Sequence, residues 1–402
     1  MAVLPALVTS MVLASSPAMR YSSQLRMESF LRTANLSETQ DRAVIEDVVI
    51  TPRGQVIFYT PRMELKAILE PQLLLRRSFT QPTLEVLTFL FLRGEYQVAR
   101  GFKTWALESL TYGYFPFEDF RVPAPTDNGG RRLLDASKYA YSESMVGFDY
   151  TGIRRTYIGV AGGLVFNGLL DPPTTPHNPK DRMTPAQVSP EVRAQAFHSV
   201  TRRFVLGGEI YARDVNFSTD AHLTVAQATP IFQYLFTPLI NGRLQIGAAV
   251  GESRPQQAEG LPLPNQDILM PIGEAALQTP VPVGYHWPVT AKLAVRYASF
   301  VNAYSTAFFP RAEGSFALQW KGRRQAQVDL ELSAAQAVTD GPHSRDGEER
   351  LSLKIQWPLT RSSAVVASGR LLRLREFLIE DQPIYKWFAG VGLVIRQENG
   401  RL

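Results

Sequence analysis

The segment of residues 351–357, Leu-Ser-Leu-Lys-Ile-Gln-Trp, decides the fold class because apolar and polar side chains alternate along it without interruption. Successive side chains of a β-strand point to opposite faces, so the odd-numbered apolar residues share one face and Ser352, Lys354 and Gln356 share the other. Residues 325–332 repeat this pattern, with glutamine and acidic residues at every second position. The alternation predicts β-strands with one apolar and one polar face.

Eight short turns, most of which contain arginine, separate runs of about twelve residues with this alternation. Between consecutive turns lies a longer polar connection that contains proline and glycine. Short turns at one end and long loops at the other are typical of outer-membrane barrels, whose short turns face the periplasm. The predicted turns are Thr60–Met63, Arg100–Phe102, Gly152–Arg154, Thr201–Arg203, Asn241–Arg243, His286–Pro288, Lys321–Arg323 and Thr360–Ser362.

The number of strands follows from these turns. Eight hairpins supply sixteen strands, Ile384–Gln397 supplies one more, and Tyr21–Leu31 supplies the first, ahead of a polar external loop at Thr33–Arg42. The sum, about 18, is even, as single-chain bacterial barrels require. The predicted fold is therefore all-β: a single transmembrane antiparallel β-barrel of about 18 strands, located in the bacterial outer membrane.

One predicted strand departs from the alternation. Ser368 and Arg370 have the same parity as Leu372 and Leu374. Either a β-bulge near Gly369 or a different register of the strand would explain the mixture.

The first 18 residues are apolar and end in small residues, which predicts a secretory signal peptide at 1–18 and a barrel at 19–402. Because the segment lacks Lys or Arg at its beginning, a signal anchor or an upstream start codon are alternatives. The chain has no cysteine, which excludes disulfides and thiolate metal sites. A net charge of +5 without a basic stripe gives no indication of nucleic-acid binding.

Charged and amide side chains occupy the polar face of many predicted strands. A lipid-facing Arg or Lys at the bilayer midplane costs about 2–4 kcal/mol, so these side chains are expected to point into the lumen. A barrel of this size is too wide for its own side chains to fill, which predicts an aqueous conduit. Its mixed charges suit neutral or weakly charged polar solutes such as sugars. The predicted lumen-lining residues are Glu64, Lys66, Glu70, Gln72, Arg193, Gln195, Glu209, Arg213, Gln245, Lys292, Arg296, Gln325, Gln327, Asp329, Glu331, Lys354 and Gln356.

Aromatic residues lie near the ends of predicted strands, where rings with a polar edge favour the headgroup layer. They are Tyr112, Tyr114, Phe115, Tyr285, Trp287, Trp320, Tyr385, Trp387 and Phe388.

The sequence contains no evident catalytic or metal-binding arrangement. Of the five histidines, His198 precedes Ser199 within a predicted strand, so the two side chains point to opposite faces and cannot act as base and nucleophile together. No enzyme activity, cofactor or metal is predicted.

Three segments carry a resemblance to known proteins: residues 48–53, the Thr60–Arg62 turn and residues 207–213. They resemble outer-membrane barrels of myxobacteria, and the 18-strand plan is most similar to the barrel components of Wzx/Wzy-type polysaccharide secretion. The final strand, with Gly390, Leu393 and Ile395, resembles the signal for the barrel-insertion machinery. The resemblance implies an exit pore for exopolysaccharide or capsule that works with a periplasmic polysaccharide-export protein.

Three other interpretations remain open on the sequence. One is a general diffusion porin or nutrient channel, constricted by an inward-folded loop at Pro116–Asp135. Another is a structural barrel of an envelope-spanning motility or adhesion complex. The last is a secreted soluble β-sandwich.

Overall fold

The computed structural model describes most of the chain between residues 18 and 401. The described ranges are 18–35, 42–77, 82–114, 138–169, 186–218, 221–237, 239–254, 266–283, 287–301, 308–322, 326–340, 344, 346–375 and 384–401. The strands are β1 Ala18–Asn35, β2 Arg42–Tyr59, β3 Met63–Arg77, β4 Pro82–Ala99, β5 Phe102–Tyr114, β6 Lys138–Tyr150, β7 Thr156–Leu169, β8 Gln187–Ser199, β9 Phe204–Phe217, β10 His222–Leu235, β11 Asn241–Arg254, β12 Gln266–Val283, β13 Trp287–Val301, β14 Phe308–Lys321, β15 Gln327–Ala337, β16 Gly347–Pro358, β17 Ser363–Arg375 and β18 Ile384–Arg401.

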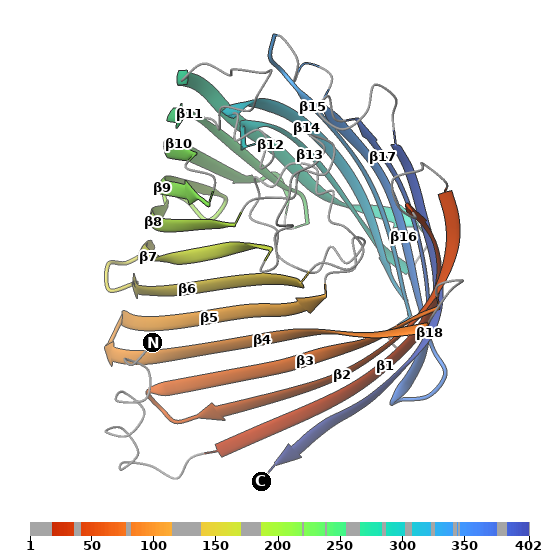
Figure 1. Cartoon of the computed structure of the whole chain (residues 1–402). Coiled ribbons are helices and arrows are strands. Elements are labelled where there is room, and N and C mark those ends of the chain that lie inside the picture. The colour runs from red at the N-terminus through yellow and green to blue at the C-terminus, as the bar shows by residue number, and fades with distance from the viewer. Residues whose placement is uncertain are drawn as a thin grey trace.

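The strands form one closed antiparallel ring (Figure 1). Each strand pairs with its neighbours in sequence, and β18 pairs with β1 from Arg20↔Arg401 to Arg32↔Phe388. The ladder shifts register between Tyr21 and Ser22 on β1, and again between Gln97 and Ala99 on β4. Closure leaves no free sheet edge. The 18-stranded barrel is confirmed, and the β-sandwich interpretation is wrong.

The two ends of the barrel differ in the length of their connections. Short turns such as 60–62, 100–101 and 359–362 lie at one end, where β1 begins beside Tyr59 and β18 ends beside Arg20. At the other end, consecutive strands are separated by longer stretches of sequence. Short turns mark the periplasmic face of such barrels, so this other end of the strands is the external one.

Threonine organises four of the short turns. In each, the Thr side-chain oxygen accepts hydrogen bonds from the backbone N–H groups two and three residues later, as at Thr360, where the distances are 3.2 and 3.0 Å. This local bonding satisfies backbone donors that the ladder leaves unpaired. The other three are Thr60, Thr201 and Thr237.

The Thr237 turn corrects one prediction. The turn was expected at Asn241–Arg243, but these residues begin β11, and the chain reverses at residues 236–240. Trp287 and Pro288 likewise belong to β13, while residues 284–286 lie outside the described residues.

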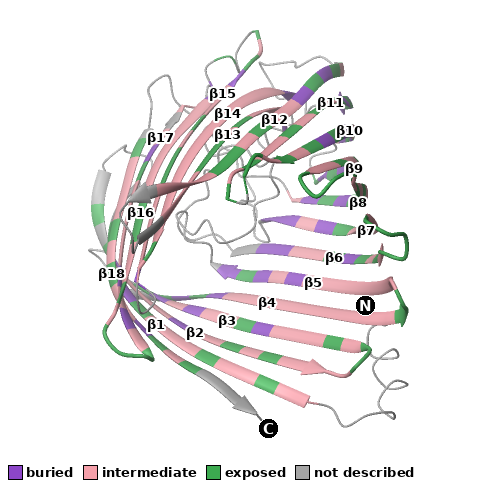
Figure 2. Cartoon of the chain, turned by 180° about the vertical axis from the view of Figure 1, so that it is seen from behind, coloured by how far each residue is buried: buried purple, intermediate pink, exposed green. Residues whose placement is uncertain are grey.

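The outer face of the ring is apolar. Large hydrophobic side chains such as Leu69, Val146, Ile210 and Leu269 are exposed there, with Leu269 74% accessible. Exposed positions recur along the strands in Figure 2, and the burial of β8 alternates over its first residues. A closed barrel with an apolar exterior can span a bilayer because every backbone group is paired within the ring. The chain is therefore an outer-membrane β-barrel. Among the described residues no helix is long and apolar enough to cross a membrane.

Polar and apolar residues share one face of β17 without a β-bulge in the strand. β17 pairs with β16 and with β18 in an unbroken register through Gly369. Ser368, Arg370 and Leu372 all take the inward parity, and Leu371 is on the lipid-facing side. The expected bulge is absent from this described strand, and leucine simply occupies part of the inner wall.

Glu108 is an outward-facing carboxyl group in the middle of its strand, away from the two ends of the barrel. Glu108 on β5 faces outward, and its carboxylate accepts hydrogen bonds from Ser142, at 2.9 Å, and from Ser144 on β6. The neighbouring outward side chains include Val146 and Leu164, both well exposed. The two hydroxyl groups offset part of the cost of placing a carboxyl group against lipid.

Replacing Glu108 by leucine should therefore stabilise the protein. A lipid-facing acidic residue costs less than the ~2–4 kcal/mol of a basic one, so Glu108→Leu is expected to raise the free energy of unfolding by about 1 kcal/mol. Reversible urea titration in lipid vesicles measures this difference. Ser29→Leu, at another outward position, is the control, and an unchanged or lowered stability of Glu108→Leu would contradict the interpretation.

Candidate functional site

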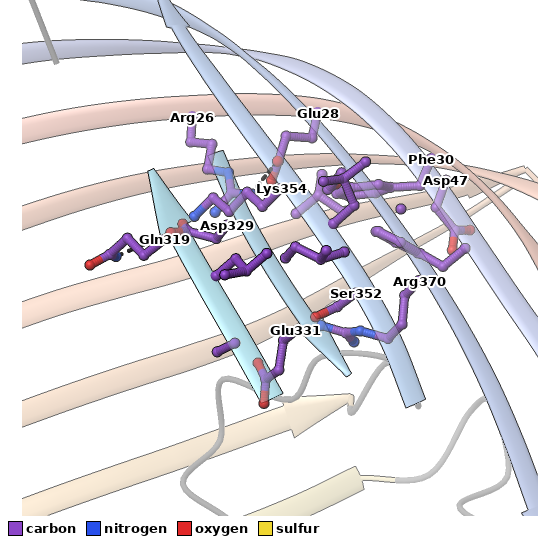
Figure 3. A pocket seen from close by; sticks show the side chains of 18 of the residues that line it. Arg26, Glu28, Phe30, Asp47, Gln319, Asp329, Glu331, Ser352, Lys354 and Arg370 are labelled. Carbon is purple, nitrogen blue, oxygen red and sulfur yellow. Dashed lines mark hydrogen bonds and ion pairs between the residues drawn. The ribbon is translucent and has the colours of Figure 1, made fainter. Parts of the chain in front are cut away.

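A cavity of about 500 Å³ lies against the inner wall of the barrel (Figure 3). Its lining comes from β13–β18 and from β1–β4. These elements are distant in sequence but form one continuous sector, because β18 pairs with β1. The labelled side chains in Figure 3 combine acidic, basic, amide, hydroxyl and aromatic groups around the same space.

The β1 part of the cavity carries a buried ion pair. Arg26 and Glu28 are two residues apart on the same face of the strand, and their guanidinium and carboxylate groups are in contact. The Glu28 side chain is only 2% exposed. A carboxylate removed from water to this extent needs a cationic partner, and the pair therefore fixes both side chains against the wall.

The opposite flank, on β14–β16, is a hydrogen-bonded acidic group. Asp329 accepts hydrogen bonds from the amides of Gln319 at 3.1 Å and Gln327 at 2.6 Å. Lys354 is its cross-strand neighbour on β16. Glu331, next along the inner face of β15, is exposed to the cavity. Donors, acceptors and both signs of charge thus lie within one sector.

Two phenylalanines form an apolar floor between these polar groups. The rings of Phe30 on β1 and Phe388 on β18 have centroids 4.6 Å apart, and the guanidinium of Arg370 lies 6.0 Å from the Phe388 ring centroid. Phe388 was expected among the interfacial aromatic residues, but it points inward, on the opposite face from Tyr385 and Trp387. The site can therefore hold both the polar and the apolar part of a small solute.

A second cavity, of about 460 Å³, lies at the periplasmic end of the inner wall. Glu95 is the centre of its charged groups, because Arg93 and Lys103 each approach its carboxylate to 2.7 Å. Arg20 lies 5.3 Å from the ring of Tyr59 across the same mouth. Glu64 also lines this cavity.

Further charged pairs continue around the inner wall. Arg311 on β14 contacts Glu313 and Glu348, both at 3.4 Å, and Glu313 lies 3.9 Å from Arg296. On β7, the Tyr157 hydroxyl donates to Asp149 at 2.7 Å and accepts from Gln195 at 3.1 Å.

The register places every predicted lumen residue that the structure describes on the inward parity. Cross-strand partners share a face, so Gln245↔Glu274↔Arg296 links β11 to the cavity-lining β13. Of the predicted residues, the upper cavity brings together Gln72, Lys292, Asp329, Glu331 and Lys354. Away from both cavities are Lys66, Glu70, Arg193, Gln195, Glu209, Arg213, Gln245, Arg296, Gln327 and Gln356. Gln325 lies outside the described residues.

Several of these residues already have partners on the wall. Glu70 lies 3.6 Å from Arg53, and Gln356 accepts a hydrogen bond from Arg396 at 3.3 Å. Lys66 and Arg193 lie over aromatic rings, 6.0 Å from the centroid of Phe91 and 5.6 Å from that of Tyr211. Such pairing keeps a wet wall ordered and leaves fewer charges to act on a solute.

Sequence reasoning missed some of the most central groups. Arg26 and Glu28 alternate with Leu25 and Met27, which is the same signal that identified β15 and β16, whereas Asp47 follows Glu46 and has no such signal. Arg370 was not predicted to line the lumen, because Leu372 and Leu374 point to the same face of its strand as Arg370 does.

The inner wall is also less uniformly polar than the sequence suggested. On β9–β12, inward residues including Val215, Leu223, Val225 and Met270 pack into a buried apolar cluster with Phe308. The apolar cluster therefore interrupts the mixed-charge wall toward the external ends of these strands, while Glu209, Gln245 and Glu274 keep polar groups on their inner face. Within the described part of the chain, no group of three or more acidic or histidine side chains has an arrangement that could hold a metal ion.

Comparison with solved structures gives matches that cover nearly the whole chain at low sequence identity. Acinetobacter baumannii OccAB3 is 8% identical, with 94% of this chain and 99% of that chain covered and a TM-score of 0.49. Pseudomonas aeruginosa OpdK with vanillate is 8% identical, with 94% and 98% covered and a TM-score of 0.49. A BenF-like porin from Pseudomonas fluorescens Pf-5 is 8% identical, with 94% and 99% covered and a TM-score of 0.48.

No family model and no curated protein matches the sequence. The resemblance to barrels of polysaccharide secretion therefore has no support from these comparisons.

Proposed function

We propose that this barrel is a passive channel for small polar solutes across the outer membrane. The observation that carries the proposal is the closed ring of strands whose inner wall holds a cavity lined by groups of both charges. A ring of eighteen strands is wide enough to leave aqueous space inside. Neutral or weakly charged molecules that form hydrogen bonds fit this lining better than strongly charged ions, because opposite charges on the wall offset each other.

The inward residues would act as many weak contacts rather than as one tight site. Gln72, Lys292, Asp329, Glu331 and Lys354 share the upper cavity, where a solute could exchange hydrogen bonds with each in turn. Conduction requires binding that is favourable enough for entry and weak enough for release. Polar groups of the wall that are hydrogen-bonded to each other, such as Gln319 and Gln327 with Asp329, favour weak binding and easy release. Each group can re-form its hydrogen bond within the wall when a solute leaves.

Liposome swelling tests the proposal. Liposomes that contain the folded protein should swell in isotonic arabinose or glucose, while liposomes with heat-denatured protein should not. Bilayers that contain the protein should also show discrete conductance steps in KCl. Folded, inserted protein that produces neither swelling nor conductance would contradict the proposal.

Polysaccharide export and a structural role in a motility or adhesion complex predict different results. A strain without the gene would lose its surface polysaccharide, while precursor synthesis continued, if the barrel were an exit pore working with a periplasmic export protein. Co-purification with motility proteins would indicate the structural role. The channel proposal predicts normal surface polysaccharide and slower uptake of small polar solutes.

A further inference from the structure

A row of charged side chains crosses the outer surface of β16–β18 near the external end. In the register, Glu349 pairs with Arg373 and Arg373 pairs with Tyr385, so the three residues lie side by side on consecutive strands. Arg373 donates to both oxygens of Glu349, at 3.0 and 3.1 Å, and Arg375 donates to one of them at 2.9 Å. The Arg373 guanidinium lies 5.8 Å from the centroid of the Tyr385 ring.

These side chains face the membrane and not the lumen. Ser352 on β16 and Arg370 on β17 point into the cavity, and the odd-numbered positions of both strands have the opposite parity. Leu371 has the same odd parity as Arg373, and it is 55% exposed on the outer surface. Arg373 and Arg375 are therefore accessible from the lipid side.

The row lies at the upper boundary of the apolar band. The next row below it consists of Leu351, Leu371 and Trp387, and the outward face of β16 stays apolar from Leu351 to Trp357. That stretch and Leu359 beyond it span about 26 Å of strand at ~3.3 Å per residue, or about 20 Å along the membrane normal at a strand tilt of about 40°, which is most of the ~25 Å apolar band of such barrels. Tyr385 and Trp387 mark the interface, where aromatic rings with a polar edge are favoured. The guanidinium groups thus lie at the depth of the outer-leaflet headgroups.

The row carries an excess of positive charge, unlike two other charged pairs on the outward face at this end. Arg373 and Arg375 share the single carboxylate of Glu349, which leaves one positive charge in excess. Elsewhere on the outward face at this end, Arg254 pairs with Glu252 at 2.7 Å and His222 with Asp214 at 2.6 Å. Neither of these pairs has an excess of cations. Arg373 and Arg375 are about one third and two fifths exposed, so their outer N–H groups can reach a ligand.

We propose that Arg373 and Arg375, with Tyr385 beside them, bind a phosphate group on the headgroup of an outer-leaflet lipid. Two guanidinium groups around one anion give the charge-assisted, bidentate geometry that phosphate favours. Basic groups at this depth attract anionic headgroups. The phosphate competes with Glu349 for the same N–H donors. This site is on the outside of the barrel and is independent of solute passage through it.

Binding of purified, detergent-solubilised protein to bis-phosphorylated lipid A tests the proposal, with native mass spectrometry as the readout. The double variant Arg373→Gln/Arg375→Gln should bind on the order of tenfold more weakly, because two charge-assisted hydrogen bonds are lost. Glu349→Gln should bind more tightly than the unaltered protein, because the competing carboxylate is removed. Arg254→Gln, which changes an arginine elsewhere on the same rim, should bind as the unaltered protein does.

Two further probes identify the source of the phosphate. The unaltered protein should bind enzymatically dephosphorylated lipid A on the order of tenfold more weakly than it binds lipid A. The double variant should bind the two lipids equally. Inorganic phosphate should not displace the lipid. Equal binding of lipid A by the double variant, equal binding of both lipids by the unaltered protein, or displacement by inorganic phosphate would overturn the proposal. Unheated gel mobility shows that each variant is folded before it is compared.

Discussion

Gly392→Val is expected to prevent the barrel from closing. Gly392 lies on the inner face of the last strand, opposite Glu28 of the first strand. A Cβ atom at this glycine would lie 2.4 Å from the Glu28 Cγ and 2.4 Å from the Met27 carbonyl oxygen. The carbonyl belongs to the backbone and cannot turn away, so the two strands would have to separate. Overpacking typically costs about 1–3 kcal/mol and occasionally more, and here the cost acts on the strand pairing that closes the ring.

The effect can be measured as the fraction of protein that folds into detergent micelles, from the mobility of unheated samples on a gel. Gly314→Val is the matched control, because Gly314 is also within a strand and a Cβ there meets no atom within 4 Å. The control should fold as well as the unaltered protein. If Gly392→Val folds equally well, the close contact between β18 and β1 is not needed for closure.

Reversing charges in the upper cavity is expected to change the ion selectivity of the channel. Glu331→Lys replaces an exposed inward carboxylate by a cation, a change of two charge units beside the path of the ion. One unit charge about 8 Å from an ion contributes about 0.5 kcal/mol in water, salt at 0.1 M reduces this to about 0.2 kcal/mol, and a change of two charge units acts with opposite sign on anions and cations. The ratio of anion to cation permeability should therefore rise about three- to tenfold. Lys354→Glu should shift the ratio in the opposite direction.

Reversal potentials across planar bilayers under a KCl gradient measure the ratio. Gln336→Lys adds a cation to the same strand, β15, but on its outward face, and should leave the ratio unchanged. If the inward and outward variants shift the reversal potential equally, the charges act through the overall potential of the protein and not from within the lumen.

The sequence alone determined the strand plan and the faces of most strands. Alternation along β15 and β16 was enough to assign an inward and an outward side. Side chains of a strand repeat their direction every two residues, and the same holds for each neighbouring strand. The short turns were also largely predictable. Thr60, Thr201 and Thr360 stand at expected positions, and each organises its own turn by hydrogen bonds within three residues.

Errors arose where a local pattern was ambiguous. The turn expected at Asn241–Arg243 is a few residues earlier, because Thr237 supplies the local hydrogen bonds and Asn241 already pairs within the ladder. Leu372 has an inward position among polar residues, so that alternation of polarity failed on β17 while alternation of direction continued.

Only the tertiary structure decided which inward residues meet. Arg26 and Glu28 at the beginning of the chain share a cavity with Asp329, Lys354 and Arg370 near its end because β18 pairs with β1. The space for Phe30 against β18 exists because Gly390 has no side chain; a Cβ there would lie 2.1 Å from the Phe30 ring. Alternation fixes the direction of each side chain through bonds that are local in sequence. The neighbours of that side chain depend on the register and closure of the ring, which contacts hundreds of residues apart in sequence establish.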